Sequence, residues 1–249
     1  MTIFDDNIAL HCELEKPSPA PARCPLVIVF HGFTGHMEEP HIVAAASAMR
    51  ESGCATLRVE LYGHGRSGGQ FRDHTLHKWL SNGLALLDYA RRLDFVTDLY
   101  LCGHSQGGLL AMLLAAMEPD RVKGLLLFSP AWNIPEEARR GELLGDRFDP
   151  RRVPETLVTW EGLELDGNYL RVAQTIRAED AIDRYAGPVL LIHGDADEAV
   201  PYRWAEEAAR RYRDCALVRI PGDTHCYDRH LDQVTAAVRE WLRQQISLQ

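Results

Sequence analysis

A serine flanked by glycines lies in the middle of the chain, between an apolar run and a stretch with helical character. Residues 103–107 read Gly-His-Ser-Gln-Gly, with the apolar run at 99–102 and the helical pattern at 106–117. A sharp turn from strand to helix holds a nucleophilic serine in a strained backbone conformation. The flanking glycines are needed because a Cβ there would collide with a neighbouring strand or helix. The pattern predicts that Ser105 is a nucleophile.

A serine hydroxyl attacks only when a base takes its proton, so a histidine has to reach Ser105. The chain has eleven histidines. In hydrolases with this turn the base follows the last strand, and His225 and His230 lie in that part of the chain. We predict His225, in the loop sequence Pro-Gly-Asp-Thr-His, because His230 already leads into the terminal helix.

The acid that orients the histidine is expected after the preceding strand, where residues 194–201 carry three carboxylates. Asp197 matches the spacing G-x-x-D-x-x-V, and its role requires a buried, hydrogen-bonded carboxylate. Asp195 is the rival and is more typical of a turn. Asp223 lies two residues before His225, a position more typical of a residue that caps a turn.

A tetrahedral intermediate needs two N–H donors for its oxyanion. One comes from the residue after the nucleophile, here Gln106, and the other from an early loop after a strand. Residues 31–35 read His-Gly-Phe-Thr-Gly and follow the apolar run 26–30, so Phe33 is the second expected donor. The Phe33 ring either walls a substrate pocket or packs in the core.

The elements that position these residues alternate between short apolar strands and amphipathic helices. Continuous apolar runs suit a parallel sheet covered on both faces, and the alternation predicts a doubly wound α/β fold. Residues 2–15 predict a peripheral hairpin or edge strands. The expected strands are 26–30, 55–59, 99–102, 124–128, 189–192 and 216–220, and the expected helices are 42–51, 76–93, 106–117, 202–213 and 231–246.

The alternation stops between residues 130 and 186, which show no clear sheet strand. Long segments of this kind inside a compact domain are usually functional. We predict a core of residues 1–129 and 187–249 and an inserted lid of residues 130–186 over the edge of the sheet that carries Ser105. Trp132 and Trp160 are candidate apolar walls of a substrate pocket.

Length, composition and charge favour a globular protein over a nucleic-acid-binding or membrane protein. A chain of 249 residues with 46% hydrophobic content forms one sizeable core. The net charge of −9 argues against a nucleic-acid surface. Because no run reaches membrane length and the first residues do not read as a signal peptide, we expect a cytoplasmic protein that does not bind membranes.

The sequence offers no motif for a metal or a nucleotide. Acidic partners at ligand spacing are lacking for His36, His41, His64, His74 and His77, and the glycine-rich residues 63–69 lack a nucleotide motif. We therefore predict no metal and no cofactor.

With these residues placed, the chain resembles the cinnamoyl and feruloyl esterases of gut and rumen bacteria, within the α/β-hydrolase superfamily. The resemblance covers nearly the whole chain. It rests on the segments 31–35, 103–108, 193–200 and 223–226 and on the position of the insert. It implies hydroxycinnamate esters as substrates, a lid that forms much of an aromatic acyl pocket, and a homodimer. Glu137, Glu142 and Asp146 are either groups that bind phenolic hydroxyls or solvated surface charges.

Three other functions remain open on the sequence. A short-chain carboxylesterase or a monoacylglycerol lipase-like enzyme keeps the triad and changes the acyl pocket. A hydrolase of carbon–carbon bonds uses the same triad on ring-fission products. A binding protein without turnover is disfavoured, because it has no need of an activated nucleophile.

Overall fold

The computed structural model describes residues 1–247, which fold around one eight-stranded sheet. The strand order is β1-β2-β4-β3-β5-β6-β11-β12. These strands are β1 (Thr2–Asp5), β2 (Ile8–Glu15), β3 (Cys24–Phe30), β4 (Ala55–Val59), β5 (Val96–His104), β6 (Val122–Phe128), β11 (Val189–Gly194) and β12 (Cys215–Ile220). From β4 to β12 every pairing is parallel, whereas β2 pairs antiparallel with β1 and β4. The predicted doubly wound, mostly parallel sheet and the N-terminal hairpin are confirmed.

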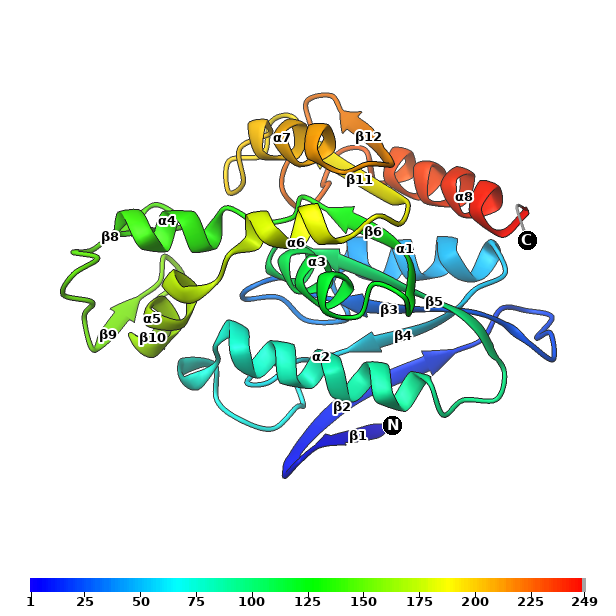
Figure 1. Cartoon of the computed structure of the whole chain (residues 1–249), viewed down its shortest axis with the longest axis horizontal. Coiled ribbons are helices and arrows are strands. Elements are labelled where there is room, and N and C mark those ends of the chain that lie inside the picture. Colours follow the sequence, from blue (N-terminus) through cyan, green and yellow to red (C-terminus); the bar gives the residue numbers. More distant parts are fainter. Residues whose placement is uncertain (248–249) are drawn as a thin grey trace.

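Helices cover both faces of the sheet (Figure 1). Alternate side chains of a strand point to opposite faces, so Leu26 and Ile28 of β3 join one apolar cluster while Val27 and Val29 join the other. The first cluster includes side chains of α2 (Leu76–Ala90), α3 (Gln106–Met117), α6 (Ala178–Arg184) and α7 (Arg203–Arg211). The second includes side chains of α1 (Pro40–Glu51) and α8 (Leu231–Ser247).

Local hydrogen bonds set the ends of the elements, which differ from the expected ends by a few residues. The helix expected over 76–93 ends at Ala90, because a turn with a 3.2 Å bond from Leu93 N to Ala90 O replaces the last helical residues. The Thr75 hydroxyl caps the start of this helix by accepting from Lys78 N at 3.2 Å. Within residues 1–247, no helix is both long and apolar enough to cross a membrane.

Residues 130–186 connect β6 to β11 and add no strand to the eight-stranded sheet. They form two small hairpins and three helices; Figure 1 shows most of this insert to the left of the sheet. Its elements before α6 are α4 (Ile134–Arg140), β7 (Glu142–Leu143), β8 (Asp146–Arg147), β9 (Thr156–Val158), β10 (Glu164–Asp166) and α5 (Asn168–Thr175). The last helix, α6, packs against α3.

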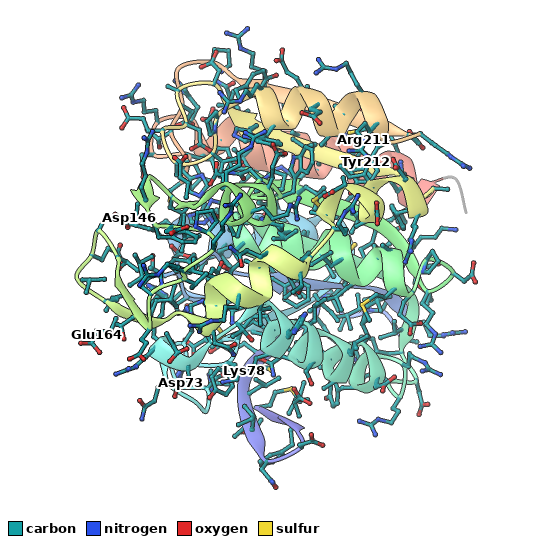
Figure 2. All side chains as sticks on the ribbon, turned by 60° about the vertical axis from the view of Figure 1, so that its left-hand side comes forward. Asp73, Lys78, Asp146, Glu164, Arg211 and Tyr212 are labelled. Atoms are coloured by element: carbon teal, nitrogen blue, oxygen red, sulfur yellow. The ribbon has the colours of Figure 1, made fainter. Side chains whose placement is uncertain are left out.

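The insert also contacts the core at a short 3-10 helix, η1 (Phe71–Asp73), which packs against β10. Arg72 of η1 pairs with Glu164 of β10 at 3.2 Å. Figure 2 shows Glu164 at the left margin of the molecule, with Asp146 above it and Asp73 below it, nearer the middle. Both partners of this ion pair are about half exposed, so it contributes little stability.

Candidate active site

The predicted catalytic residues all follow strands at one edge of the sheet. Ser105 follows β5, Asp197 follows β11 and His225 follows β12, while Phe33 follows β3. Because these four strands run parallel, their carboxyl ends meet at the same edge. The topology therefore gathers groups that are spread along the chain from Phe33 to His225.

The turn at Ser105 has the geometry that its sequence predicts. Ser105 adopts φ 55° and ψ −121°, and the residue is 6% exposed. A Cβ at Gly103 would collide with the Gly107 backbone, and one at Gly107 would collide with the carbonyls of Phe30 and His31. A 2.9 Å hydrogen bond from Ser105 N to Phe128 O anchors the turn to β6. The sharp bend thus places the hydroxyl at the tip of β5.

Two backbone amides lie free beside the serine. Gly32 lies close to Ser105, since a Cβ built on Gly32 would stand 3.3 Å from the Ser105 Cβ. In residues 1–247 the N–H groups of Phe33 and Gln106 donate to no protein acceptor. Gln106 also opens α3, whose N-terminal end attracts negative charge. Among the described residues, both amides are therefore left without a protein acceptor, as the predicted role requires.

Asp197 and His225 are joined by a 2.7 Å hydrogen bond from His225 Nδ1 to Asp197 Oδ2. The Asp197 side chain is fully buried, and its Oδ1 accepts from the amides of Ala199 at 2.9 Å and Val200 at 2.8 Å. Burial by itself raises the pKa of Asp197, but hydrogen bonds from His193 and His225 outweigh it and hold that pKa well below its ordinary value. The carboxylate stays ionised and holds the proton of His225 on Nδ1.

The loop that carries His225 is held from two sides. His104, the residue before the serine, lies with its Nε2 2.9 Å from the His225 carbonyl. Asp223 is fully buried and accepts from the amides of Thr224, Arg229 and His230 at 2.9, 3.1 and 2.9 Å. The rival residues thus have other partners: Asp223 builds the turn, and Asp195 accepts from Gly222 N and pairs with Arg219.

Ser105 and His225 line the same small cavity, of about 90 Å³. Its other lining residues include Phe33 and Glu39 from the loop between β3 and α1, and Leu144 and Trp160 from the insert. A second cavity of about 300 Å³ shares Leu144, Trp160 and Ala199 with the first. Trp160 is 56% exposed, and its ring stacks on Phe33 with centroids 6.0 Å apart. The insert therefore forms one wall of the site.

The two predicted substrate-binding tryptophans lie in different surroundings. Trp132 is 4% exposed, donates from Nε1 to Trp204 O at 3.0 Å, and lines neither cavity. Its surroundings are those of a packing residue, because hydrophobic neighbours and one buried acceptor surround it. Among the acidic candidates of the insert, Glu137 and Glu142 line the second cavity and Asp146 lines neither.

The structure adds residues that the sequence did not single out. His193 Nε2 lies 3.1 Å from Asp197 Oδ2, and Leu144 and Glu39 line the catalytic cavity. Burial raises the pKa of Glu39. His193 lies four residues before Asp197, a spacing visible in the sequence, but no local pattern marks the other two.

The histidines considered for a metal do not gather on one face. His74 is buried and His77 is exposed, whereas the rings of His64 and His74 pack with centroids 5.1 Å apart. A different set, His41, His104 and Cys226, brings ligand atoms within 4.8 Å of one another. His104 Nε2 contacts the His225 carbonyl, so this histidine has a hydrogen-bond partner that supports the loop of His225.

A hollow of about 620 Å³ lies at the opposite edge, where residues at the starts of β5 and β6 line it with Gly187 and Pro188. No serine, histidine or cysteine lines it. The cavity that brings a serine and a histidine together therefore lies at the other edge of the sheet.

Comparison with known proteins agrees with this geometry. Residues 21–171 match the family described as "Serine aminopeptidase, S33" (Hydrolase_4), and residues 169–245 match that described as "TAP-like protein". The structure resembles that of Est1E from Butyrivibrio proteoclasticus with ferulic acid bound, at 57% identity and a TM-score of 0.98 over 99% of both chains. Mouse monoglyceride lipase is 24% identical over 94% of this chain and 85% of its own length. An α/β-hydrolase fold, a serine turn and a family match over more than half of the chain lead to one conclusion: this protein belongs to the serine aminopeptidase S33 family of α/β-hydrolases.

Proposed function

We propose that this protein is a serine esterase that hydrolyses hydroxycinnamate esters such as feruloyl, caffeoyl and p-coumaroyl esters. The observation that carries the proposal is the likeness over 99% of both chains to a protein whose structure holds ferulic acid. The arrangement of Ser105, His225 and Asp197 supplies the chemistry, and the insert supplies an aromatic wall beside it.

In the first half of the reaction, Ser105 Oγ attacks the ester carbonyl while His225 Nε2 takes the hydroxyl proton. Asp197 keeps the other proton on Nδ1 and stabilises the imidazolium. The amides of Phe33 and Gln106 bind the oxyanion. When the intermediate collapses, His225 returns its proton to the leaving alkoxide, and an acyl-serine remains.

In the second half, water replaces the alcohol. His225 removes a proton from the water as it attacks the acyl carbonyl, and the same two amides bind the new oxyanion. Collapse breaks the bond to Ser105 Oγ, which regains its proton from His225, and the free acid leaves. His225 thus carries the proton in both halves of the reaction.

The acyl group is expected against the insert, which we propose acts as a lid over the residues at this edge. Trp160, Phe33 and Leu144 present apolar surface to the catalytic cavity, and a planar cinnamoyl group can lie on such faces. Glu137 and Glu142 in the adjoining cavity are the candidates for binding phenolic hydroxyls. Burial raises the pKa of Glu137.

The second candidate is an esterase for aliphatic acyl groups, favoured by the likeness to mouse monoglyceride lipase along 94% of the chain. Both candidates use the same triad. They differ in the acyl group that fits beside Trp160, so substrate preference separates them.

The test compares kcat/KM for methyl ferulate with kcat/KM for 4-nitrophenyl butyrate, with Ser105→Ala measured alongside. We expect a preference for ferulate and a loss of roughly three to six orders of magnitude in the variant, whose fold should be unchanged. A strong preference for butyrate would reject the proposed substrate. Residual turnover above about a tenth in S105A would reject the triad. An amino-acid 4-nitroanilide tests whether the family description extends to peptidase activity here.

We also propose a cytoplasmic homodimer, on the family resemblance of the sequence. Light scattering after size-exclusion chromatography measures the oligomeric state, and cell fractionation measures the location. A monomer across micromolar concentrations would reject the dimer.

A further inference from the structure

The glycine-rich loop after β4 carries a buried histidine that the proposed mechanism does not use. His64 is 5% exposed and stands between Gly63 and Gly65, whose φ angles are 78° and 52°. Glycine adopts such positive φ angles without steric cost. Hydrogen bonds from Gly63 N to Gly68 O at 2.9 Å and from Ser67 N to His64 O at 3.0 Å close the loop. The loop therefore holds His64 in a defined place.

The ring of His64 reaches the segment that carries the Phe33 amide. Its Nε2 lies 2.6 Å from the carbonyl oxygen of Phe33, and its Nδ1 lies 2.9 Å from that of Tyr62. Burial lowers the pKa of His64, so the ring holds one proton at neutral pH. We assign this proton to Nε2, the nitrogen with the shorter contact, which then donates to the Phe33 carbonyl.

A second histidine holds the preceding carbonyl. The amide of Leu61 donates to His31 Nε2 at 3.1 Å, which leaves the proton on Nδ1, 2.8 Å from the Gly32 carbonyl. The peptide unit from Gly32 to Phe33 is planar and trans, so its N–H points away from the carbonyl that His31 binds. A hydrogen bond to the carbonyl also polarises the amide and strengthens its N–H as a donor.

We propose that His64 is a positioning residue for the oxyanion hole: its Nε2–H holds the Phe33 carbonyl while His31 holds the Gly32 carbonyl, so that the Phe33 amide stays aimed at Ser105. The inference rests on the role of the Phe33 amide in the proposed function. His64 acts through the loop, because it donates to the backbone rather than lining the catalytic cavity. Donors that are held in place before the reaction need no reorganisation in the transition state, so the loss of His64 should lower kcat and leave KM unchanged.

Three variants test this role. H64L keeps similar volume and removes the donor, whereas H64Q keeps an amide N–H that can donate to the Phe33 carbonyl. H74L is the matched control: His74 is also buried, packs on the Phe33 ring at 5.1 Å between centroids, and its only hydrogen-bond contact in residues 1–247 is to Phe71 O. We expect kcat to fall about 10- to 100-fold in H64L with KM within about threefold, because misplacement of about 1 Å has effects of this size. H64Q should stay within about fivefold of wild type, and H74L within about threefold.

Binding of a transition-state analogue gives a second readout. A boronic acid forms a tetrahedral adduct at the serine, with an oxygen in the oxyanion hole, whereas ferulate binds as a planar product. In H64L the boronic acid affinity should fall by the same factor as kcat/KM, while the ferulate affinity should change by less than about twofold. Equal kcat losses in H64L and H74L, or a loss in KM alone, would overturn the proposal.

The wild-type protein provides a readout that does not depend on the folding of any variant. Imidazole ¹⁵N spectra at neutral pH should show the His64 proton on Nε2, and a proton on Nδ1 would overturn the proposal. The kinetic comparison is run with 4-nitrophenyl butyrate as well as methyl ferulate. If methyl ferulate is not a substrate, the proposed function fails on that point, whereas the butyrate data still decide the role of His64.

Discussion

Both carboxylate oxygens of Asp197 accept hydrogen bonds from within the protein. Oδ1 accepts from two backbone amides, whereas Oδ2 accepts from His225 Nδ1 and lies close to His193. One oxygen therefore fixes the loop, and the other fixes the imidazole. This division lets structure and catalysis be separated by one substitution.

Asp197→Asn should lower kcat by roughly 10⁴-fold with little change in thermal stability. The Asn carbonyl can still accept the two amides, but its NH₂ group faces His225 Nδ1 and forces the wrong tautomer. Asp195→Asn is the control, because Asp195 pairs with Arg219 outside the triad, and its kcat should stay within about twofold of wild type. Circular dichroism melting and ester turnover measure both variants. If D195N lost as much activity as D197N, Asp197 would not be the acid.

At the scale of elements, the insert contributes to both packing and the site. Its first residues enter the core through Trp132, and its second hairpin brings Trp160 to the catalytic cavity. The ion pair between η1 and β10 links the hairpin to the core. Two tryptophans of one insert thus have different surroundings, which predicts different consequences when each is changed.

Trp160→Ala should lower kcat/KM for methyl ferulate about tenfold and change that for 4-nitrophenyl butyrate by less than about threefold. An aromatic contact of about 1.4 kcal/mol corresponds to this factor. Trp132→Phe removes the hydrogen bond to Trp204 O and should lower the free energy of unfolding by about 1 kcal/mol without altering the substrate ratio. For each variant, the ratio of kcat/KM for methyl ferulate to kcat/KM for 4-nitrophenyl butyrate and the urea unfolding curve are measured. A changed ratio in W132F would show that Trp132 contacts the substrate and would contradict the prediction.

At the scale of the whole molecule, buried histidines couple stability to pH. Burial lowers the pKa of five of them: His31, His41, His64, His74 and His104. The pKa reaches about 4 for His41 and about 3 for His74. In the unfolded chain a histidine has a pKa of about 6.5. Below that pH these histidines bind protons in the unfolded state but stay neutral in the folded state until the pH reaches their lower folded pKa.

The free energy of unfolding should therefore be steady above about pH 6.5 and fall steeply between about pH 6.5 and 5. Each of these histidines adds up to about 1.4 kcal/mol per pH unit to the slope until its folded pKa is reached. Urea titrations across this range measure the slope. His74→Gln should reduce it by close to one proton, and His77→Gln, at an exposed position of α2, serves as the control. Stability that stays constant down to pH 5 would contradict the prediction.

The fold could be predicted from the sequence because its signals are local. Short continuous apolar runs marked β3, β4, β6 and β11, and the side chains of β3, β4 and β11 are buried throughout. The serine turn was equally visible, since Gly103 and Gly107 are dictated by collisions within a few residues or with an adjacent strand. Parallel strands then imply that loops after β3, β5, β11 and β12 share one edge.

The sequence by itself therefore determined the sheet, the turn at Ser105 and the short list of partners for that serine. Only the tertiary structure decided which carboxylate meets His225, which tryptophan reaches the cavity, and that His64 holds the Phe33 carbonyl. Contacts between distant loops join Asp197 to His225 across 28 positions, Phe33 to His64 across 31 and His104 to His225 across 121. The reason is physical: backbone conformation depends on neighbours along the chain, whereas burial and hydrogen bonding between distant loops depend on how the whole sheet and its helices pack.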